Sequence, residues 1–291
     1  MIEILLPLSL VFIMFNIGLS LTIEDFRRVL RIPRGVTVGM INLLVISPLL
    51  AAVVATVFNL SPTLSVGLVL LGSAPGGTMA NMYTHLAKGQ TALSVTMTAL
   101  SSVLCVITVP LYLGLADNHF GDGNLIGDVN MLGVAARVVA ITLIPLVVGM
   151  YVRSRATGWA IAKKPGFDRA ALVILVLVVI FAVVAEWDLI VDNFTKIALA
   201  AFTLNVLAMG ISFAAARAVR LGDKAATAIA LELGIHNATV ALTVGNLLGD
   251  DAFMVPAGVY SLFMFTNGAI FARYMSKRNT GPVTQVGTEP V

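Results

Sequence analysis

The chain has 291 residues, of which 58% are hydrophobic and only 11% charged, and its mean hydropathy is +0.98. A soluble domain carries about 25% charged residues, so this composition excludes a soluble protein and indicates a membrane protein with several spans. The formal net charge of +3 does not indicate nucleic-acid binding, because the basic residues fall between apolar runs. The sequence has no phosphate-binding glycine loop, zinc-protease motif or nucleophile elbow, and Cys105 is its single cysteine. We therefore expect no enzyme, no disulfide and no metal cluster.

Nine apolar segments follow one another along the chain, and most approach the roughly 20 residues that a helix needs to cross the hydrocarbon core. They lie at about residues 4–23, 36–58, 64–84, 91–116, 131–151, 170–187, 197–216, 225–247 and 252–272. The sequence therefore predicts an all-α polytopic membrane protein with a single transmembrane domain over residues 1–278. A polar tail over residues 279–291 is expected to be disordered and cytoplasmic.

The basic residues predict an orientation in the membrane. Of the 18 Lys and Arg residues, all but Arg137 and Lys196 fall on one side under this assignment, and the opposite loops are acidic. Basic loops stay in the cytoplasm. We therefore expect a multi-pass protein of the cell membrane with its N-terminus outside and its C-terminus in the cytoplasm, an arrangement that requires an odd number of spans.

Two of the nine segments are interrupted. The third contains Pro75, Gly76 and Gly77 in succession, and the eighth contains Gly234 within the stretch "LELGIHNATV". Proline and glycine break helices, and membrane helices tolerate a break where the freed backbone groups meet protein or line a cavity. Two interrupted spans in corresponding positions are typical of transporters with internal repeats. The offset of five spans predicts inverted repeats, with spans one to four matching spans six to nine.

A carboxylate and an imidazole lie within the eighth segment. An ionised carboxylate near the middle of a membrane costs about 2.5 kcal/mol or more, so Glu232 is interpreted as a cation ligand or a proton carrier, against a structural hydrogen bond or a misplaced span end. His236 lies four residues on, and shares a face with Glu232 on an intact helix. It could neighbour an ion, contact substrate, exchange a proton, or donate to Glu232 as a neutral imidazole.

Amides and hydroxyls mark further candidates. Asn81 and Asn237 lie at the two breaks, where an amide either binds ligand or satisfies freed backbone groups. A lone amide such as Asn267 more often joins two helices. Ser94 and Thr98 are four residues apart in "TALSVTMTALSS". Their spacing alone indicates backbone hydrogen bonds or close packing, because membrane helices commonly use Ser and Thr in this way.

Three stretches resemble one known family. "SAPGGTMANMYTHLAKGQTALSV" and "ALELGIHNATVAL" are similar to signature segments of the bile acid:sodium symporter family, and "MFNIGLSLTIEDF" resembles the opening segment of that family. The resemblance covers the chain from about Leu6 to Tyr274. It implies a panel domain and a core domain, with discontinuous spans three and eight crossing in the core. It also implies two sodium ions at the crossing and an organic anion in the cleft between the domains.

The resemblance assigns residues to each site. The first sodium site would use Asn81, Ser94, Thr98 and Glu232, although Ala80 stands where the family usually has a serine ligand. The anion would contact three residues of the breaks and the last span: Thr78, Asn237 and Asn267.

The second sodium site would use Glu232 and the residue four positions later, with a further ligand near Asn42. That later residue is usually glutamine in the family and is His236 here. Sodium is a hard cation that prefers oxygen ligands, so the second site is expected to be weakened or lost. The chain would then bind at most two cations.

The sequence therefore predicts a secondary active transporter that works by alternating access. It would couple the symport of an organic anion, such as a bile acid-like steroid or a small carboxylate, to a cation, with sodium as the first choice. The positive ends of half-helices at the breaks suit a carboxylate or sulfonate. The alternatives are a proton-coupled transporter that uses Glu232 and His236, and an uncoupled channel-like protein or receptor. The expected partners are the organic anion, Na⁺ or H⁺ and the lipid bilayer, and no cofactor beyond the coupling ion is expected.

Overall fold

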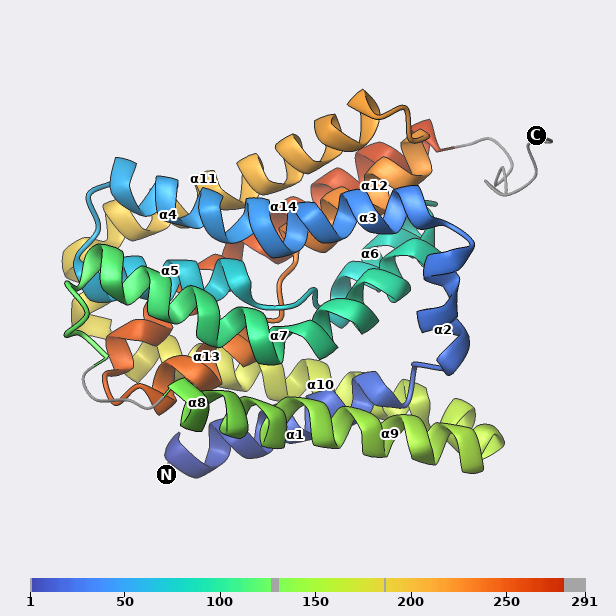
Figure 1. Ribbon diagram of the computed structural model, residues 1–291, viewed down its shortest axis with the longest axis horizontal. Helices are drawn as coiled ribbons and strands as arrows, with labels where there is room; N and C mark the ends of the chain where they lie inside the picture. The colour runs from blue at the N-terminus through green and yellow to red at the C-terminus, as the bar shows by residue number, and fades with distance from the viewer. Residues whose placement is uncertain (1, 127–130, 186, 280–291) are drawn as a thin grey trace.

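The computed structural model describes residues 2–126, 131–185 and 187–279, and the regular structure in these ranges is helical, apart from a single two-residue bridge (Figure 1). Of the tail expected over residues 279–291, all but Asn279 lies outside the described residues. The helices are α1 (Ile2–Gly18), α2 (Ile23–Arg27), α3 (Pro33–Ile41), α4 (Ser47–Val57), α5 (Pro62–Ser73), α6 (Thr78–Leu86), α7 (Thr91–Phe120), α8 (Met131–Val138), α9 (Ile144–Arg155), α10 (Thr157–Ala185), α11 (Trp187–Ala218), α12 (Asp223–Gly234), α13 (Ala238–Leu247) and α14 (Val255–Arg278). Wide π-type turns at Asn42–Ile46 and Val139–Leu143 join α3 to α4 and α8 to α9, and short 3₁₀ turns lie at Arg28–Leu30 and Asp251–Met254.

Among the described residues, six helical segments are long and apolar enough to cross a membrane. A seventh is added if the bent pair Ile4–Gly18 and Ile23–Leu30, which turns by 76°, counts as one span. The protein is therefore an all-α, multi-pass membrane protein. The six segments are Pro33–Val57, Thr91–Phe120, Leu132–Arg155, Thr157–Ala185, Phe194–Ala218 and Asp251–Arg278.

One helix is much longer than its apolar run. The apolar pattern starts near residue 170, but α10 begins at Thr157 and so includes the basic stretch that the sequence pattern assigns to a loop. Tertiary packing supports this extension, because the ring of Phe167 lies 5.6 Å from Phe12 and 5.9 Å from Phe15 of α1. Lys164, Asp168 and Arg169 are consequently helical and lie beside α1.

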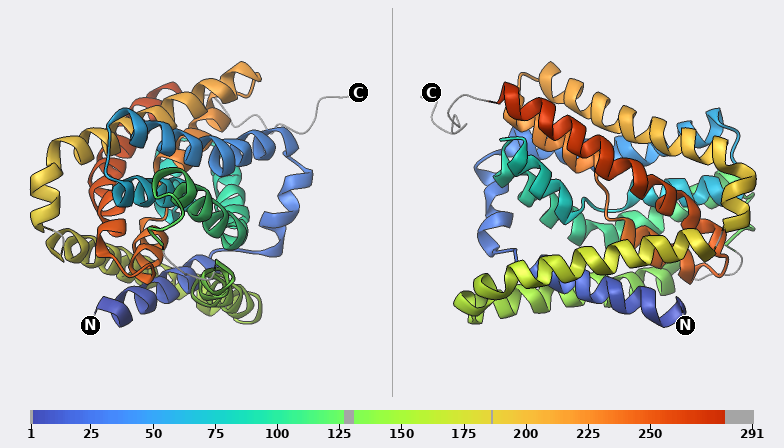
Figure 2. Two further views of the ribbon diagram at one scale, coloured as in Figure 1. Left: turned by 60° about the vertical axis from the view of Figure 1, so that its left-hand side comes forward. Right: turned by 180° about the vertical axis from the view of Figure 1, so that it is seen from behind.

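Helices α1, α9 and α10 contact one another and lie together along the lower edge of Figure 1. Glycines bring α1 and α9 close, since a Cβ on Gly18 would lie 2.1 Å from the Leu146 carbonyl oxygen and one on Gly149 would lie 2.3 Å from that of Phe15. Small residues allow such approaches between membrane helices. The opposite edge is formed by α3, α4 and α11, with α5, α6, α7 and α13 between (Figures 1 and 2).

The two sequence interruptions coincide with helix ends and lie against each other. Helix α5 ends at Ser73 and α6 begins at Thr78, while α12 ends at Gly234 and α13 begins at Ala238. The Gly77 N–H donates to the Ile235 carbonyl at 2.9 Å, and the Asn237 N–H donates to the Pro75 carbonyl at 2.8 Å. Each break therefore satisfies backbone groups that the other leaves free, as buried peptide groups require.

Candidate functional site

The Glu232 carboxylate lies fully buried at this meeting point, near the end of α12. The hydroxyl of Thr98 donates to Glu232 Oε1 at 2.5 Å, and the hydroxyl of Ser94 donates to Oε2 at 2.8 Å. Both hydroxyls come from α7, where a spacing of four residues places them on one face. Thr98 Oγ1 also lies 3.4 Å from Asn81 Oδ1, on α6. The structure therefore brings together all four residues of the expected first sodium site.

Oxygen atoms outnumber hydrogen donors around this carboxylate. The single hydroxyl hydrogen of Thr98 has three acceptors in reach, since Oγ1 also lies 3.1 Å from the Ser94 carbonyl oxygen. An ionised carboxylate offers about four lone-pair positions, of which two hydroxyls fill two. A hard cation is held by several oxygen atoms of this kind, so the cluster is chemically suited to a cation.

The backbone at the first break passes directly over Glu232. A Cβ added to Gly76 would lie 1.9 Å from Glu232 Oε1 and 2.6 Å from Cδ, so only glycine fits at this position. The Gly76 N–H donates to the Ser101 hydroxyl at 3.3 Å, which ties the break to α7. Both broken elements and α7 are therefore fixed around the same carboxylate.

His236 lies in the second break but faces away from this cluster. Its Nδ1 lies 3.2 Å from the Ala74 carbonyl oxygen, and its Nε2 lies 3.1 Å from Ser47 Oγ. A carbonyl only accepts, so Nδ1 carries a hydrogen, and a neutral ring then accepts the Ser47 hydroxyl at Nε2. Within the described part of the chain, no hydrogen bond joins His236 to Glu232. The alternative of an imidazole that donates to Glu232 is therefore wrong.

Asn42, near which a further ligand was expected, has no hydrogen bond to Glu232 or His236 among the described residues, and its Oδ1 is buried without a hydrogen-bond partner there. Asn42 Nδ2 donates to the Val38 carbonyl of its own helix at 2.8 Å, and Ser47, five residues on, is the residue that contacts His236. The π-type turn at Asn42–Ile46 shifts the helix face by one residue before Ser47, and such turns are frequent at functional sites. A sequence pattern of ordinary helical spacing does not show this shift.

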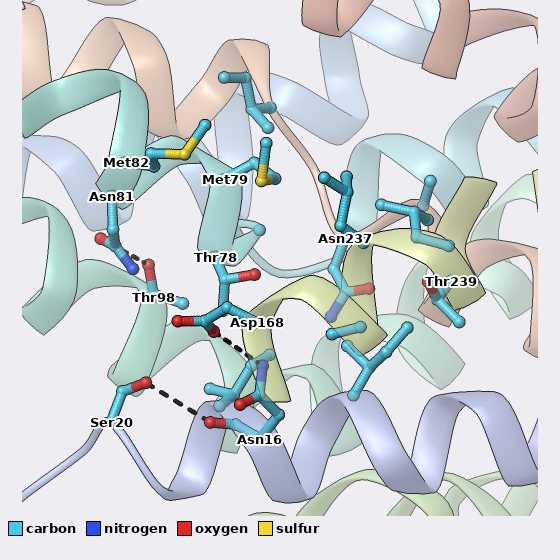
Figure 3. Close-up of a pocket in the computed structure, with 18 of the residues that line it drawn as sticks. Asn16, Ser20, Thr78, Met79, Asn81, Met82, Thr98, Asp168, Asn237 and Thr239 are labelled. Atoms are coloured by element: carbon cyan, nitrogen blue, oxygen red, sulfur yellow. Dashed lines mark hydrogen bonds between the residues drawn. The ribbon is translucent and has the colours of Figure 1, made fainter. Parts of the chain in front are cut away.

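A cleft of about 540 Å³ opens beside the two breaks, a size typical of small-molecule sites (Figure 3). It lies between α1 and α10 on one wall and α6, α7, α13 and α14 on the other. Thr78, Asn81, Thr98 and Asn237 line it, together with His236. Of the expected contacts, Ser94 and Glu232 lie buried behind this lining, and Asn267 lies outside the cleft.

Asn267 is held in a separate network. Its Nδ2 donates to Asn205 Oδ1 at 2.9 Å, and it does not line the cleft. Asn205 Nδ2 in turn donates to the Gly234 carbonyl at 2.7 Å, which also accepts from the Tyr260 hydroxyl at 3.1 Å. These side chains satisfy the carbonyl that is freed where α12 ends. Asn267 therefore joins two helices, α14 and α11, as expected of a lone amide in an apolar segment.

Asn237 caps the other half-helix and keeps an amide group toward the cleft. Its Oδ1 accepts from the Val240 N–H at 3.3 Å at the start of α13, and the one hydrogen-bond acceptor of its Nδ2 within the described ranges is the sulfur of Met14, at 3.7 Å. Sulfur is a weak acceptor, so this N–H₂ group can still donate to an anion at the positive end of a helix. Thr78 lies at the start of α6, as Asn237 lies at the start of α13.

A polar cluster on the opposite wall is not indicated by the sequence motifs. Asp168 Oδ1 accepts from Asn16 Nδ2 at 3.0 Å (Figure 3). Asp168 also forms an ion pair with Lys164, whose Nζ donates to Asn16 Oδ1 at 3.1 Å. Lys164 and Asp168 are four residues apart on α10, a spacing that favours pairing on a helix. The sequence contains this spacing, but it indicates an ion pair only if the basic stretch before residue 170 is read as helical rather than as a loop.

Comparison with known proteins identifies the family of this chain. The model of the Sodium Bile acid symporter family matches residues 7–193. An uncharacterized sodium-dependent transporter of Bacillus subtilis is 29% identical over 273 residues, covering 91% of this chain and 81% of its own length. The human ileal sodium/bile acid cotransporter is 25% identical, with 91% of this chain and 77% of its own length covered. A probable chloroplastic sodium/metabolite cotransporter of Arabidopsis thaliana is 26% identical over 89% of this chain, and the chain spans 63% of that protein.

The family is one of transporters and not of enzymes, and its model matches well over half of this chain. The chain belongs to the sodium bile acid symporter family.

Proposed function

We propose that this protein is a secondary active transporter that couples the inward symport of an organic anion to sodium by alternating access. One relative is named as a sodium-dependent transporter, and others are named as sodium cotransporters of bile acids or of unspecified metabolites. The substrate class proposed here is an amphipathic or small carboxylate or sulfonate. We place the protein in the cell membrane with its N-terminus outside, in accord with the distribution of its basic residues.

The oxygen cluster around Glu232 carries the proposal. A buried carboxylate with two hydroxyl neighbours and the Asn81 amide oxygen offers sodium the hard ligands that it prefers. The hydroxyls of Ser94 and Thr98 would turn their hydrogens away from the carboxylate when the cation binds. The bound cation would neutralise Glu232 and hold α6, α7 and α12 together. Cation binding can therefore bias the equilibrium between inward-open and outward-open states.

The proposed membrane topology has nine spans. Six are the long apolar segments, one is the segment that begins with α1, and two are the interrupted pairs α5–α6 and α12–α13. The antiparallel bridge between Gly76 and His236 supports a crossing of the two interrupted spans. We further propose that the two halves are inverted repeats. The panel domain would be built from α1, α8, α9 and α10, and the core domain from the remaining spans.

The anion would bind in the cleft, between panel and core. Thr78 and Asn237 stand at the starts of α6 and α13, where N–H groups and helix dipoles favour negative charge. Asn267 would act indirectly, by holding Asn205 against the end of α12.

We propose a single sodium site. His236 is fully engaged by Ala74 and Ser47, and a ring nitrogen is a poor sodium ligand, so a second sodium ion has no oxygen donor at this position. The same contacts separate His236 from Glu232, which supports sodium rather than a proton as the coupling ion.

The test is thermal unfolding of the purified protein in detergent, titrated with sodium against potassium at constant ionic strength and across pH. Ligand binding to the folded state stabilises it by about 2.7 kcal/mol at a concentration of 100 times the dissociation constant. We expect a saturable sodium shift at every pH tested, and its loss in Glu232→Gln. The isosteric glutamine removes the charge but keeps a side chain of the same shape.

Other outcomes would support the alternatives. Stabilisation that follows pH without sodium, and that disappears in His236→Gln, would indicate proton coupling. Reconstituted protein that equilibrates an anion without accumulating it under a sodium gradient would indicate an uncoupled channel.

A further inference from the structure

The cleft wall opposite the cation cluster carries three charged side chains, all on α10: Lys164, Asp168 and Arg169. Two of them neutralise each other. Lys164 donates to both Asp168 and Asn16, and Asp168 Oδ1 accepts from both Lys164 and Asn16. The Lys164 side chain is only 21% exposed. Two of the three Lys164 N–H donors are thereby occupied and its charge is paired with Asp168, so Lys164 is not a free anion receptor.

Arg169 has no such partner. It lines the same cleft, yet among the described residues it forms neither an ion pair nor a side-chain hydrogen bond. The guanidinium group presents five N–H donors in a planar fork that matches the two oxygens of a carboxylate or the oxygens of a sulfonate. Such charge-assisted, two-pronged contacts are about twice as strong as neutral hydrogen bonds.

The charges of the loaded cleft then leave one positive group unmatched. Bound sodium is balanced by Glu232, and Lys164 is balanced by Asp168, so Arg169 is the remaining positive charge among the described lining residues, with histidines counted as neutral. Much of the remaining lining is apolar, for example Ile17, Leu172 and Phe265. An anion with one acid group and an apolar body complements this arrangement, whereas a dianion leaves one negative charge uncompensated.

We propose that Arg169 pairs with the acid group of the transported anion and that the Lys164–Asp168–Asn16 cluster restricts the cleft to monoanions. The inference rests on the proposed sodium-coupled transport of an organic anion, and it adds the residue and the charge class that select the substrate.

The first experiment measures thermal stabilisation at saturating sodium by two monoanions of different size, pyruvate and cholate, each compared with its neutral amide. We expect the acids to stabilise the wild-type protein more than the amides. Arg169→Gln is expected to weaken the response to the acids about three- to tenfold, while the response to sodium alone stays unchanged. Arg169→Lys keeps the charge without the fork and should recover part of the response. Lys163→Gln is the matched control, since Lys163 lies on the same helix and does not line the cleft.

The second experiment needs no substrate. Ser20 is exposed and lines the cleft, and the natural Cys105 is buried, so Ser20→Cys provides a selective label site. We compare its rates of reaction with an anionic and a cationic methanethiosulfonate reagent, ethylsulfonate and ethyltrimethylammonium. If the Arg169 charge has no counter-charge in the cleft, Arg169→Gln should lower the ratio of the anionic to the cationic labelling rate about threefold or more. Lys163→Gln should change the ratio much less.

The charge class is tested with Asp168→Asn, which frees Lys164. This variant should raise the response to the dianion 2-oxoglutarate relative to pyruvate, and an unchanged ratio would contradict the proposed charge balance.

Three results would overturn the inference. The first is an equal response of Arg169→Gln and wild type to the acids. The second is the absence of any acid response in wild-type protein that still responds to sodium, a result that leaves the sodium site intact. The third is an effect of Arg169→Gln on stabilisation by phosphatidylglycerol but not by cholate, which would assign Arg169 to a lipid phosphate. Loss of the sodium response in wild type would instead refute the proposed function itself.

Discussion

Replacing Gly76 with alanine tests whether the first break must pass directly over the Glu232 carboxylate. The added Cβ would lie 1.9 Å from Glu232 Oε1, whereas ordinary van der Waals contact begins near 3.4 Å. The oxygen must therefore move by about 1.5 Å, or the backbone must move by the same amount. The hydroxyl of Thr98 lies 2.5 Å from this oxygen. A displacement of that size stretches the contact to roughly 4 Å, beyond hydrogen-bonding range.

The loss can be estimated from contacts of this kind. A hydrogen bond to a charged group contributes about 1.5–3 kcal/mol, and the same oxygen would be lost to a cation bound among Asn81, Ser94 and Thr98. Since about 1.4 kcal/mol corresponds to a factor of ten, Gly76→Ala should weaken sodium binding about 10- to 100-fold. Overpacking of this kind also lowers the free energy of unfolding by about 1–3 kcal/mol.

The assay is the sodium titration of thermal unfolding described above, with potassium as the reference ion. Gly114→Ala, on the same helix as Ser94 and Thr98, is the matched control, because nothing lies within 4 Å of its added Cβ. Alanine should stabilise that helix slightly and leave the sodium response intact. A folded Gly76→Ala protein whose sodium affinity is within twofold of wild type would refute the placement of the cation at Glu232.

Three further substitutions examine the surroundings of this site. Thr98→Val removes a hydroxyl ligand at constant shape and should weaken sodium binding about tenfold. Thr108→Val is the control and should have no effect, because the Thr108 hydroxyl donates to the Leu104 carbonyl of its own helix. Equal sodium affinities of Thr98→Val and wild type would exclude Thr98 as a ligand. His236→Gln should retain the sodium response, because His236 contacts Ala74 and Ser47 rather than Glu232; its complete loss, measured in the same titration, would contradict the single-site proposal. Asn205→Leu leaves the Tyr260 hydroxyl and the Asn267 amide without their shared partner. The thermal midpoint of this variant should fall by an amount equivalent to about 2–4 kcal/mol, more than that of Asn267→Leu. An unchanged midpoint would show that the network does not support the end of α12.

Much of the membrane architecture follows from local chemistry. The apolar runs mark the long helices, and Pro75, Gly76 and Gly77 mark a break, because proline and glycine act on the chain wherever they occur. The spacing of Ser94 and Thr98 shows that the two hydroxyls share a helix face, although the spacing alone gives no reason to connect them with Glu232. That connection depends on the resemblance of the two break motifs to a known family, and the structure brings the side chains together.

Other features depend on how distant helices rotate and pack. Helix α10 extends to Thr157 because Phe167 stacks on α1, and this extension brings Lys164, Asp168 and Arg169 to the cleft wall. The four-residue spacing of Lys164 and Asp168 is compatible with a helix, but no pattern within residues 157–169 shows that this helix packs against α1 and lines the cleft.

The sequence by itself determined that this is an all-α membrane protein with two interrupted apolar segments and a carboxylate at one of them, since composition, periodicity and helix breakers are local properties. Only the tertiary structure decided that His236 turns toward Ser47 and away from Glu232, that Asn267 lies outside the cleft, and that Arg169 lines it. The physical reason is that the partner of a side chain depends on how helices that are far apart along the chain rotate and contact one another. The spacing of residues within one helix specifies neither the rotation nor the contact.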